Sequence, residues 1–159
     1  MVRIGVTGHM NLTAETAVFV SEAIRARLRE VDGEVVGVSC IARGADSLFA
    51  EAVLDVGGSL EVVVPSRDYR ESKVGADHRE RFDALVAKAG RVRVMDFERA
   101  CREAYVAANE AVLGSIDELV AVWDGQPSGG SGGTADVVER ARSRGLPVVV
   151  IWPEGAVRE

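Results

Sequence analysis

The stretch that decides the fold is Glu118–Val138, which reads ELVAVWDGQPSGGSGGTADVV. It begins with an apolar run that ends at Trp123, continues through a glycine-rich loop, and ends in an amphipathic segment that Thr134 begins. Glycine lets a backbone approach a phosphate closely, and the first turn of a helix presents unpaired N–H groups at its positive end. This order of strand, glycine loop and helix start predicts an anion-binding site. A flexible Gly/Ser linker in a surface loop is the alternative.

The residues expected to hold the anion come from this loop and the turn before it. They are Gly125, Gly129, Gly130, Gly132, Gly133 and Thr134. We expect the backbone N–H groups of Gly132, Gly133 and Thr134 to converge at the helix N-terminus. Replacing Gly132 with Asp is then expected to abolish ligand binding, with a smaller effect on the fold.

Size and composition describe one globular domain over residues 1–159. Apolar residues make up 47% of the chain and charged residues 28%. A chain of this length can bury roughly two-thirds of its unfolded surface. It holds no apolar run of about 18 residues, and Met1 leads directly into a strand-like run, so neither a membrane segment nor a signal peptide is expected. Cys40 and Cys101 match no metal-ligand spacing, which predicts a cytoplasmic protein without a metal.

The net charge of −6 bears on the partner. Nucleic acids and anionic membranes are bound through many phosphate contacts, which an acidic surface disfavours. A local group of N–H donors with one arginine can still hold a single small anion. We therefore expect a small phosphorylated ligand, with no membrane partner and no nucleic acid.

Apolar runs at regular intervals predict about six strands with helices between them. Runs such as Val148–Ile151 are continuous rather than alternating, which is typical of parallel strands covered on both faces. The predicted strands are Val2–Thr7, Glu34–Ser39, Leu60–Pro65, Arg91–Met95, Glu118–Trp123 and Pro147–Trp152. The predicted helices are Ala14–Val31, Ala45–Val56, His78–Ala89, Phe97–Leu113 and Ala135–Arg144.

This alternation predicts a single doubly wound, Rossmann-like α/β domain of three layers with a mostly parallel sheet. The loops after the first and fifth strands can meet at one ligand only if those strands are neighbours. We therefore expect the strand order 3-2-1-5-6, with the short fourth strand at the edge beyond the third. The polar segment Ser66–Gly75 is expected to be a surface loop.

Ligands of such sheets bind beyond the carboxyl ends of the strands. That rule selects the segments Thr7–Asn11, Ser39–Asp46, Pro65–Lys73 and Asp124–Thr134. In the first of them, Gly8 would allow a tight turn, and the side chains of Thr7 and His9 could donate to a phosphate or a ribose. The alternative is an ordinary connection with His9 on the surface.

The segment after the second strand carries Ser39, Arg43, Gly44 and Asp46 as candidate ligand-binding residues. Arg43 offers a planar guanidinium to a phosphate or carboxylate. Asp46 is either a carboxylate favoured by the helix dipole or a partner of a ribose. The alternative is a helix-capping segment with a solvated arginine.

Two further side chains, Tyr105 and Asn109, lie four residues apart and so share one helix face. They could stack on a base and hydrogen-bond to it, although a tyrosine in an amphipathic helix is commonly a half-buried core residue. Trp123 and Trp152 are expected in the core.

The glycine loop also fits two better-known motifs only in part. Gly130–Ala135 matches Gly-x-Gly-x-x-Ala, but the dinucleotide fingerprint belongs to the first unit of its fold and this one lies on the last. No Gly-Lys-Ser/Thr occurs, so the chain lacks a P-loop. Neither an NAD dehydrogenase nor an NTPase is predicted, and no cofactor is expected.

Together these loops resemble the SLOG superfamily, the Rossmann-like group that contains LOG ("lysine decarboxylase-like") proteins and the DNA-processing protein DprA. Gly130–Thr134 is similar to the phosphate loop of LOG proteins, Pro-Gly-Gly-x-Gly-Thr-x-x-Glu. Ser39–Asp46 resembles the Ser-Gly-x-Ala-x-Gly-Ile-Asp segment of DprA, and Val6–His9 stands where these families carry Gly-Ser or Thr-Gly. Asp117–Gly125 is similar to nucleoside 2-deoxyribosyltransferases. The resemblance covers nearly the whole chain, and it implies a nucleotide or nucleotide-derived ligand and a homodimer.

One position departs from the LOG pattern. LOG enzymes hydrolyse the N-glycosidic bond of nucleoside 5′-monophosphates, and their catalytic glutamate lies three residues after the threonine. That position is Val137 here, and Asp136 lies one residue earlier, about 100° away around the helix. The glutamate would stabilise an oxocarbenium-like transition state or activate water. The sequence therefore keeps the binding signature and lacks the catalytic carboxylate.

The sequence predicts a nucleotide-binding sensor or ligand-binding module. The ribose of the bound nucleotide is expected to face Asp124 or Asp46. The first alternative is a phosphoribohydrolase-like enzyme, or another N-glycosidic hydrolase or transferase, in which Asp136 or Asp124 replaces the glutamate. The second is DprA-like binding of single-stranded DNA, which the net charge and the lack of a basic stripe disfavour.

Overall fold

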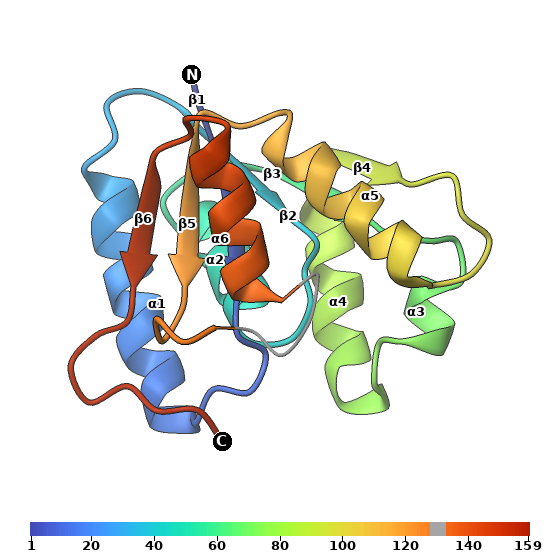
Figure 1. The fold of residues 1–159 in the computed structure, drawn as a ribbon, viewed down its shortest axis with the longest axis horizontal. Coiled ribbons are helices and arrows are strands. Elements are labelled where there is room, and N and C mark those ends of the chain that lie inside the picture. The colour runs from blue at the N-terminus through green and yellow to red at the C-terminus, as the bar shows by residue number, and fades with distance from the viewer. Residues whose placement is uncertain (128–132) are drawn as a thin grey trace.

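Six parallel strands form a sheet with the order β4-β3-β2-β1-β5-β6 (Figure 1). The computed structural model of the chain describes residues 1–127 and 133–159. The strands are β1 (Val2–Gly8), β2 (Val35–Ser39), β3 (Ser59–Val64), β4 (Arg91–Val94), β5 (Glu118–Val122) and β6 (Val148–Ile151). Every neighbouring pair runs parallel, and β1 lies between β2 and β5. The predicted strand order is confirmed, including the fourth strand beyond the third.

Helices cover both faces of this sheet, so the domain has the three predicted layers (Figure 1). One face carries α1 (Ala14–Arg29), α2 (Ala45–Asp55) and α4 (Ala76–Lys88), and the other carries α5 (Arg102–Leu113) and α6 (Thr134–Ser143). The alternation of side chains along a strand explains the division, since Val62 of β3 packs towards α4 and Val63 towards α5. None of the described helices has the length and apolar composition that a membrane span needs.

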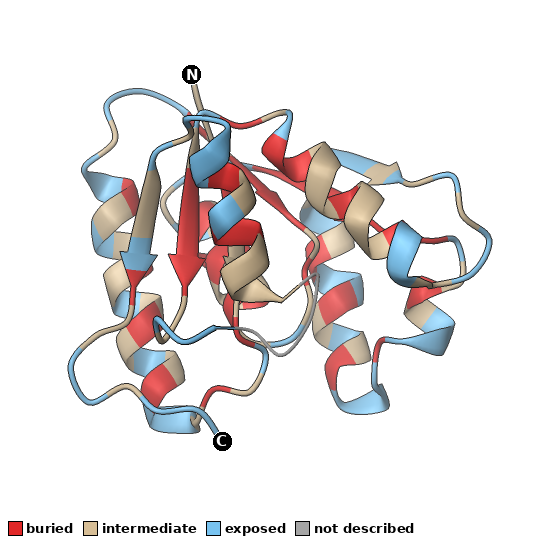
Figure 2. Cartoon of the chain, viewed as in Figure 1, coloured by how far each residue is buried: buried red, intermediate tan, exposed pale blue. Residues whose placement is uncertain are grey.

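The two strands that follow α5 and α6 differ in burial (Figure 2). Leu119–Val122 of β5 is buried throughout, because the strand lies inside the sheet between α1 and α6. The equally apolar β6 forms the edge of the sheet, and Val150 remains 42% exposed. The interpretation of Val148–Ile151 as a strand covered on both faces was therefore wrong. A continuous apolar run does not distinguish an edge strand from a central one.

Two local predictions are corrected around β4. The segment Ser66–Gly75 is not simply a loop, because it contains the short helix α3 (Tyr69–Ser72). Helix α5 begins at Arg102 rather than at residue 97. The backbone before it pairs with the segment before α3 instead: the Arg67 N–H donates to the carbonyl of Phe97 at 2.9 Å. Residues 97–100 therefore use their polar groups in a long-range contact that local periodicity does not reveal.

Two glycines bring the loops at the carboxyl edge of the sheet together. A Cβ on Gly8 would lie 2.4 Å from the Cβ of Ala45 and 2.8 Å from that of Val122. Gly44 has a φ of +73°, and a Cβ there would lie 2.6 Å from the carbonyl oxygen of His9. The start of α2 can therefore pack directly on the end of β1, and the Ala45 N–H donates to that same carbonyl at 3.1 Å.

Candidate functional site

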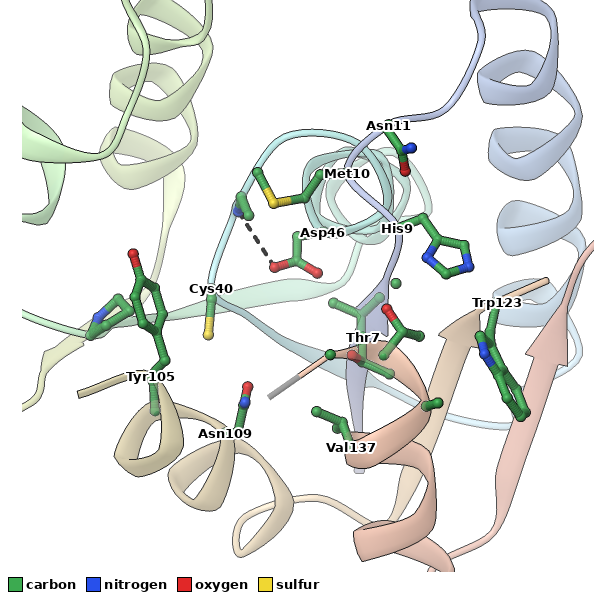
Figure 3. Close-up of a pocket in the computed structure, with 18 of the residues that line it drawn as sticks. Thr7, His9, Met10, Asn11, Cys40, Asp46, Tyr105, Asn109, Trp123 and Val137 are labelled. Atoms are coloured by element: carbon green, nitrogen blue, oxygen red, sulfur yellow. Dashed lines mark hydrogen bonds between the residues drawn. The ribbon is translucent and has the colours of Figure 1, made fainter. Parts of the chain in front are cut away.

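A cavity of about 730 Å³ opens at the carboxyl edge of the sheet (Figure 3). Its walls come from the loops after β1, β2, β3 and β5, from α5 and from the first turns of α6. These are the loops that the strand-end rule selects for ligand binding in a doubly wound sheet. The cavity therefore lies where the sequence predicted a site.

Eight of the predicted ligand-binding residues line this cavity. They are Thr7, Gly8, His9, Asp46, Tyr105, Asn109, Gly133 and Thr134. The predicted residues Gly129, Gly130 and Gly132 lie outside the described residues. The other members of the predicted set have different positions and are described below.

Ser39, Arg43, Gly44 and Gly125 are not among the lining residues. Ser39 is buried, and its hydroxyl donates to the Asp46 carbonyl and accepts the Ile41 N–H, each at 3.0 Å. The Arg43 side chain is 52% exposed, with a guanidinium nitrogen 3.8 Å from Asp77. Gly44 holds the two loops together, and Gly125 has a φ of +82° with open space where a side chain would point.

The loop between β2 and α2 is held in an uncommon conformation by buried polar groups. Ile41 has a φ of +47°, in the left-handed region that β-branched residues rarely occupy. Ser47 donates to the carbonyl of Ala42 at 2.6 Å, and Nε2 of His78 lies 3.2 Å from both the Ser47 hydroxyl and the Ile41 carbonyl. Strained backbone of this kind persists where surrounding contacts hold it, and here it places the start of α2 at the cavity.

Asp46 is the only carboxylate that lines the cavity within residues 1–127 and 133–159. Figure 3 shows its carboxyl group facing the cavity between Met10 and Cys40. Its Oδ2 accepts the Ala42 N–H at 3.4 Å. Burial raises the pKa of Asp46 from 3.8 to about 7, against the opposing effect of that hydrogen bond. Near neutral pH this group can therefore both accept and donate a hydrogen bond to a ligand.

His9 joins the first loop to the end of β5. Its Nε2 accepts the backbone N–H of Asp124 at 3.1 Å, and its ring packs edge-on against Trp152 at 5.6 Å. Burial lowers the pKa of His9, and the charge of Arg158 lowers it further. The same Nε2 also lies 3.2 Å from Oδ1 of Asp124, and the nearness of this carboxylate partly offsets the lowering of the His9 pKa.

The two carboxylates proposed as catalytic groups do not line the cavity. Asp124 contacts His9, its own loop and Arg158: one oxygen accepts the Gln126 N–H at 3.0 Å and lies 3.2 Å from His9 Nε2, and the other lies 3.5 Å from Arg158. Asp136 pairs with Arg140 one turn along α6, at 3.3 Å. On α6, the side chain that lines the cavity next to Asp136 is Val137, which is buried and faces the cavity in Figure 3.

Aromatic side chains stand at both ends of the cavity. Tyr105 and Tyr69 form an edge-to-face pair with ring centroids 6.3 Å apart, and burial raises the pKa of both phenols. At the other end, Trp123 donates from Nε1 to the carbonyl of Gln126 at 2.9 Å. The expectation that Trp123 is a core residue was wrong, because it lines the cavity, with Arg142 lying 6.0 Å from its ring centroid.

Sequence analysis also missed two cations, Lys73 and Arg158, and did not assign Cys40 a role. Lys73 ends a segment that the strand-end rule selects, so the same rule could have identified it. No local pattern identifies Arg158, which comes from the chain after β6. Burial, and then the nearby Asp46, raise the pKa of the Cys40 thiol, so it is a poor nucleophile. Within the described part of the chain, no cluster of His, Cys, Asp and Glu could hold a metal ion.

Comparisons with known proteins find likeness in fold. No family model and no curated protein matches the chain. Among solved structures, DNA processing protein A from Streptococcus pneumoniae superposes with a TM-score of 0.70 at 20% identity, over 98% of this chain and 52% of that one. The Helicobacter pylori protein gives 0.69 at 17% identity, over 99% of this chain and 68% of that one. This chain shares its fold with these two DNA processing proteins.

The likeness in fold extends to a carrier protein. The molybdenum cofactor carrier protein from Chlamydomonas reinhardtii superposes with a TM-score of 0.56 at 19% identity, over 93% of this chain and 74% of that one. The chain spans about half the length of the pneumococcal protein. At these identities the fold is what the proteins share, and the ligand has to be argued from the cavity.

Proposed function

We propose that this SLOG domain binds a small phosphorylated ligand of the nucleotide class and acts as a ligand-binding or sensor module. One observation carries the proposal: residues predicted from separate parts of the chain line a single cavity, among them Thr7, Asp46, Asn109 and Thr134. Its volume of about 730 Å³ is within the range of small-molecule sites. The carrier protein from Chlamydomonas, which has the same fold, is named for a small cofactor.

The phosphate belongs at the start of α6 in this proposal. Gly133 and Thr134 open that helix at the cavity, and the N–H groups of a first helical turn attract anions. Thr7 and Gly8 face the same space from β1. The glycines 129, 130 and 132 remain predicted members of this phosphate loop.

The rest of the ligand extends from the phosphate towards Asp46 and α5. Asp46 would receive the ribose hydroxyls, since a carboxyl group with a pKa of about 7 can accept and donate hydrogen bonds. Tyr105 and Asn109 would contact the base from one wall. Asp124, the other candidate for the ribose, is turned to His9, Gln126 and Arg158.

Slow hydrolysis is part of the proposal. Val137 occupies the wall at the position where the LOG resemblance expects a glutamate, and an apolar side chain there can neither activate water nor stabilise positive charge. Asp136 is paired with Arg140 instead. A missing group of this kind typically costs about 10²–10⁴-fold in rate.

A second candidate function is glycosidic bond cleavage that uses Asp46. It is favoured by one observation: a cavity carboxyl with a pKa near 7 is suited to general acid or base catalysis at neutral pH. This replaces the earlier assignment of Asp136 or Asp124, neither of which lines the cavity.

Binding is tested with Thr134→Glu. A carboxylate in the first turn suits the helix dipole, so α6 should keep its stability, whereas it would repel a bound phosphate. We expect the affinity for AMP, GMP, CMP or UMP, measured by titration calorimetry, to fall at least about tenfold. Thr134→Gln, similar in size and uncharged, is the matched control. Equal affinity of the two variants would contradict the position of the phosphate.

Catalysis is tested by incubating each monophosphate with the protein and measuring free base by chromatography. We expect binding without base release, and measurable release in Val137→Glu. Robust release by the unaltered protein that is lost in Asp46→Asn would establish the second candidate. Release that survives Asp46→Asn and is lost in Asp136→Asn would instead return the role to Asp136.

Single-stranded DNA is the third ligand to test, because the Helicobacter pylori protein of the same fold binds it. Within the described residues, the Lys and Arg side chains that line the cavity are Lys73 and Arg158, which is few for a polyanion. We expect no shift of an oligonucleotide in a gel at physiological salt.

We further propose a cytoplasmic homodimer, which light scattering after gel filtration would test.

A further inference from the structure

The chain after β6 returns to the cavity and forms part of its wall. It runs from the end of β6 past the start of α1 towards the loop after β1 (Figure 1). Arg158 pairs with Leu12 in an antiparallel bridge, and the Glu159 N–H donates to the carbonyl of Asn11 at 2.7 Å. The Val157 N–H donates to the hydroxyl of Thr16 at 2.8 Å. Backbone contacts therefore hold this segment on the first loop.

These contacts place the Arg158 side chain between two loops of the cavity. Its Nε donates to the Asn11 side chain at 2.9 Å, in the loop after β1. Its guanidinium lies 3.5 Å from Asp124, in the connection between β5 and α6. These two loops adjoin Thr7 at the end of β1 and Thr134 at the start of α6, where the phosphate is proposed to bind. Arg158 lines the cavity and is 42% exposed.

Within residues 1–127 and 133–159, the hydrogen bonds of Arg158 engage only part of its guanidinium N–H groups. A guanidinium has five N–H donors in a planar fork. Among the described residues, its hydrogen-bond acceptors are Asn11 at 2.9 Å and Asp124 at 3.5 Å, the second of which is long and partly solvated. Such an ion pair contributes little to stability, so an incoming anion could replace the carboxylate at small cost. Asp124 retains its bond from the Gln126 N–H in either case.

The other charged groups around the cavity lie elsewhere. Asp46 and Lys73 line the walls formed by α2 and the end of α3. His9 is beside Arg158, and burial together with the charge of Arg158 lowers its pKa, which disfavours a second positive charge there. Arg158 is therefore the cation held by the two loops that would bracket the phosphate.

We propose that Arg158, carried by the segment after β6, binds the phosphate of the ligand and exchanges Asp124 for it. The proposal rests on the function proposed above and makes Arg158 the group that distinguishes a phosphorylated ligand from its nucleoside. Asn11 is a positioning residue, because it holds Nε and leaves the other guanidinium nitrogens to the anion. Arginine suits this role better than lysine because its fork can bind two phosphate oxygens at once.

The test compares phosphorylated and unphosphorylated probes. AMP, GMP, CMP and UMP, the four nucleosides and inorganic phosphate are titrated into the unaltered protein and into Arg158→Ala. We expect the affinity for the monophosphates to fall roughly ten- to hundredfold in the variant, with nucleoside affinity unchanged. Arg158→Lys should fall between the two proteins. Asp124→Asn should strengthen monophosphate binding, because it removes the competing charge.

Arg91→Ala is the matched control. Arg91 is also exposed and forms a long ion pair of 3.8 Å with Glu61, but it lies on the edge strand β4 away from the cavity. Unchanged monophosphate binding in Arg158→Ala would overturn this inference and leave the proposed function standing. An equal loss of affinity for nucleosides and for monophosphates would also overturn the inference, because it would show that Arg158 has a structural role. If the unaltered protein binds neither the nucleotides nor phosphate, the proposed function fails and this inference fails with it.

Discussion

Replacing Asp46 with Asn is expected to stabilise the protein at neutral pH. The carboxyl group has a pKa of about 7 in the folded protein and 3.8 as its ordinary value, with burial as the cause. Between these values the folded state holds a proton that the unfolded state has lost. The free energy of unfolding therefore falls as the pH rises from about 4 to about 7, by 2.303RT per pH unit for this group. Above pH 7 the loss is complete.

The size of the effect follows from the shift. A rise of about 3 units from 3.8 to about 7, at 1.36 kcal/mol per unit, amounts to about 4 kcal/mol. Asparagine has the same shape and no charge, and its amide oxygen can still accept the Ala42 N–H. Asp46→Asn should therefore match the unaltered protein near pH 4 and exceed it by up to about 4 kcal/mol above pH 7.

Urea unfolding followed by circular dichroism, at several pH values from 4 to 8, measures this difference. Equal m-values in the two proteins would show that the midpoints report stability. Asp83→Asn is the control of opposite sign, because hydrogen bonds from Arg70 lower the pKa of that exposed carboxyl group. It should lose stability at pH 7 and approach the unaltered protein in acid. A gain in Asp46→Asn that is constant with pH, or that grows towards acid, would refute the reasoning.

Three further outcomes test the site and its support. Gly8→Ala should lower the free energy of unfolding by about 1–3 kcal/mol, because its methyl group would lie 2.4 Å from the Cβ of Ala45; an unchanged urea midpoint would contradict this packing. Since burial lowers the pKa of His9, its contribution to stability should be lost as the pH falls below its ordinary value of 6.5. His9→Ala should remove that pH dependence and cost about 1–3 kcal/mol at pH 8 by leaving the Asp124 N–H unpaired. Trp123→Phe should abolish any change in tryptophan fluorescence on ligand binding. A fluorescence change in the variant as large as in the unaltered protein would show that the ligand does not bind at the Trp123 wall.

The strands and most of the helices were predictable from local sequence. The composition of an apolar run such as Leu119–Trp123 predicts a buried strand. Apolar residues that recur with a period of 3.6 predict the buried face of a helix. The strand order followed from one further condition, that the loops after β1 and β5 meet, and the structure has them adjacent. The spacing of Tyr105 and Asn109 puts them on one helix face, and the fold turns that face to the cavity; their contact with a base stays a prediction.

What the sequence by itself determined is thus the set of elements and the edge of the sheet at which the cavity opens. Tertiary structure decided which side chains reach the cavity. Val137 faces it and Asp136 does not, because the rotation of α6 is set by its packing on the sheet. Arg158 reaches it through backbone bonds to residues more than a hundred positions earlier in the chain. Periodicity carries information about a residue and its near neighbours, whereas contacts of that kind form only when distant segments fold against each other.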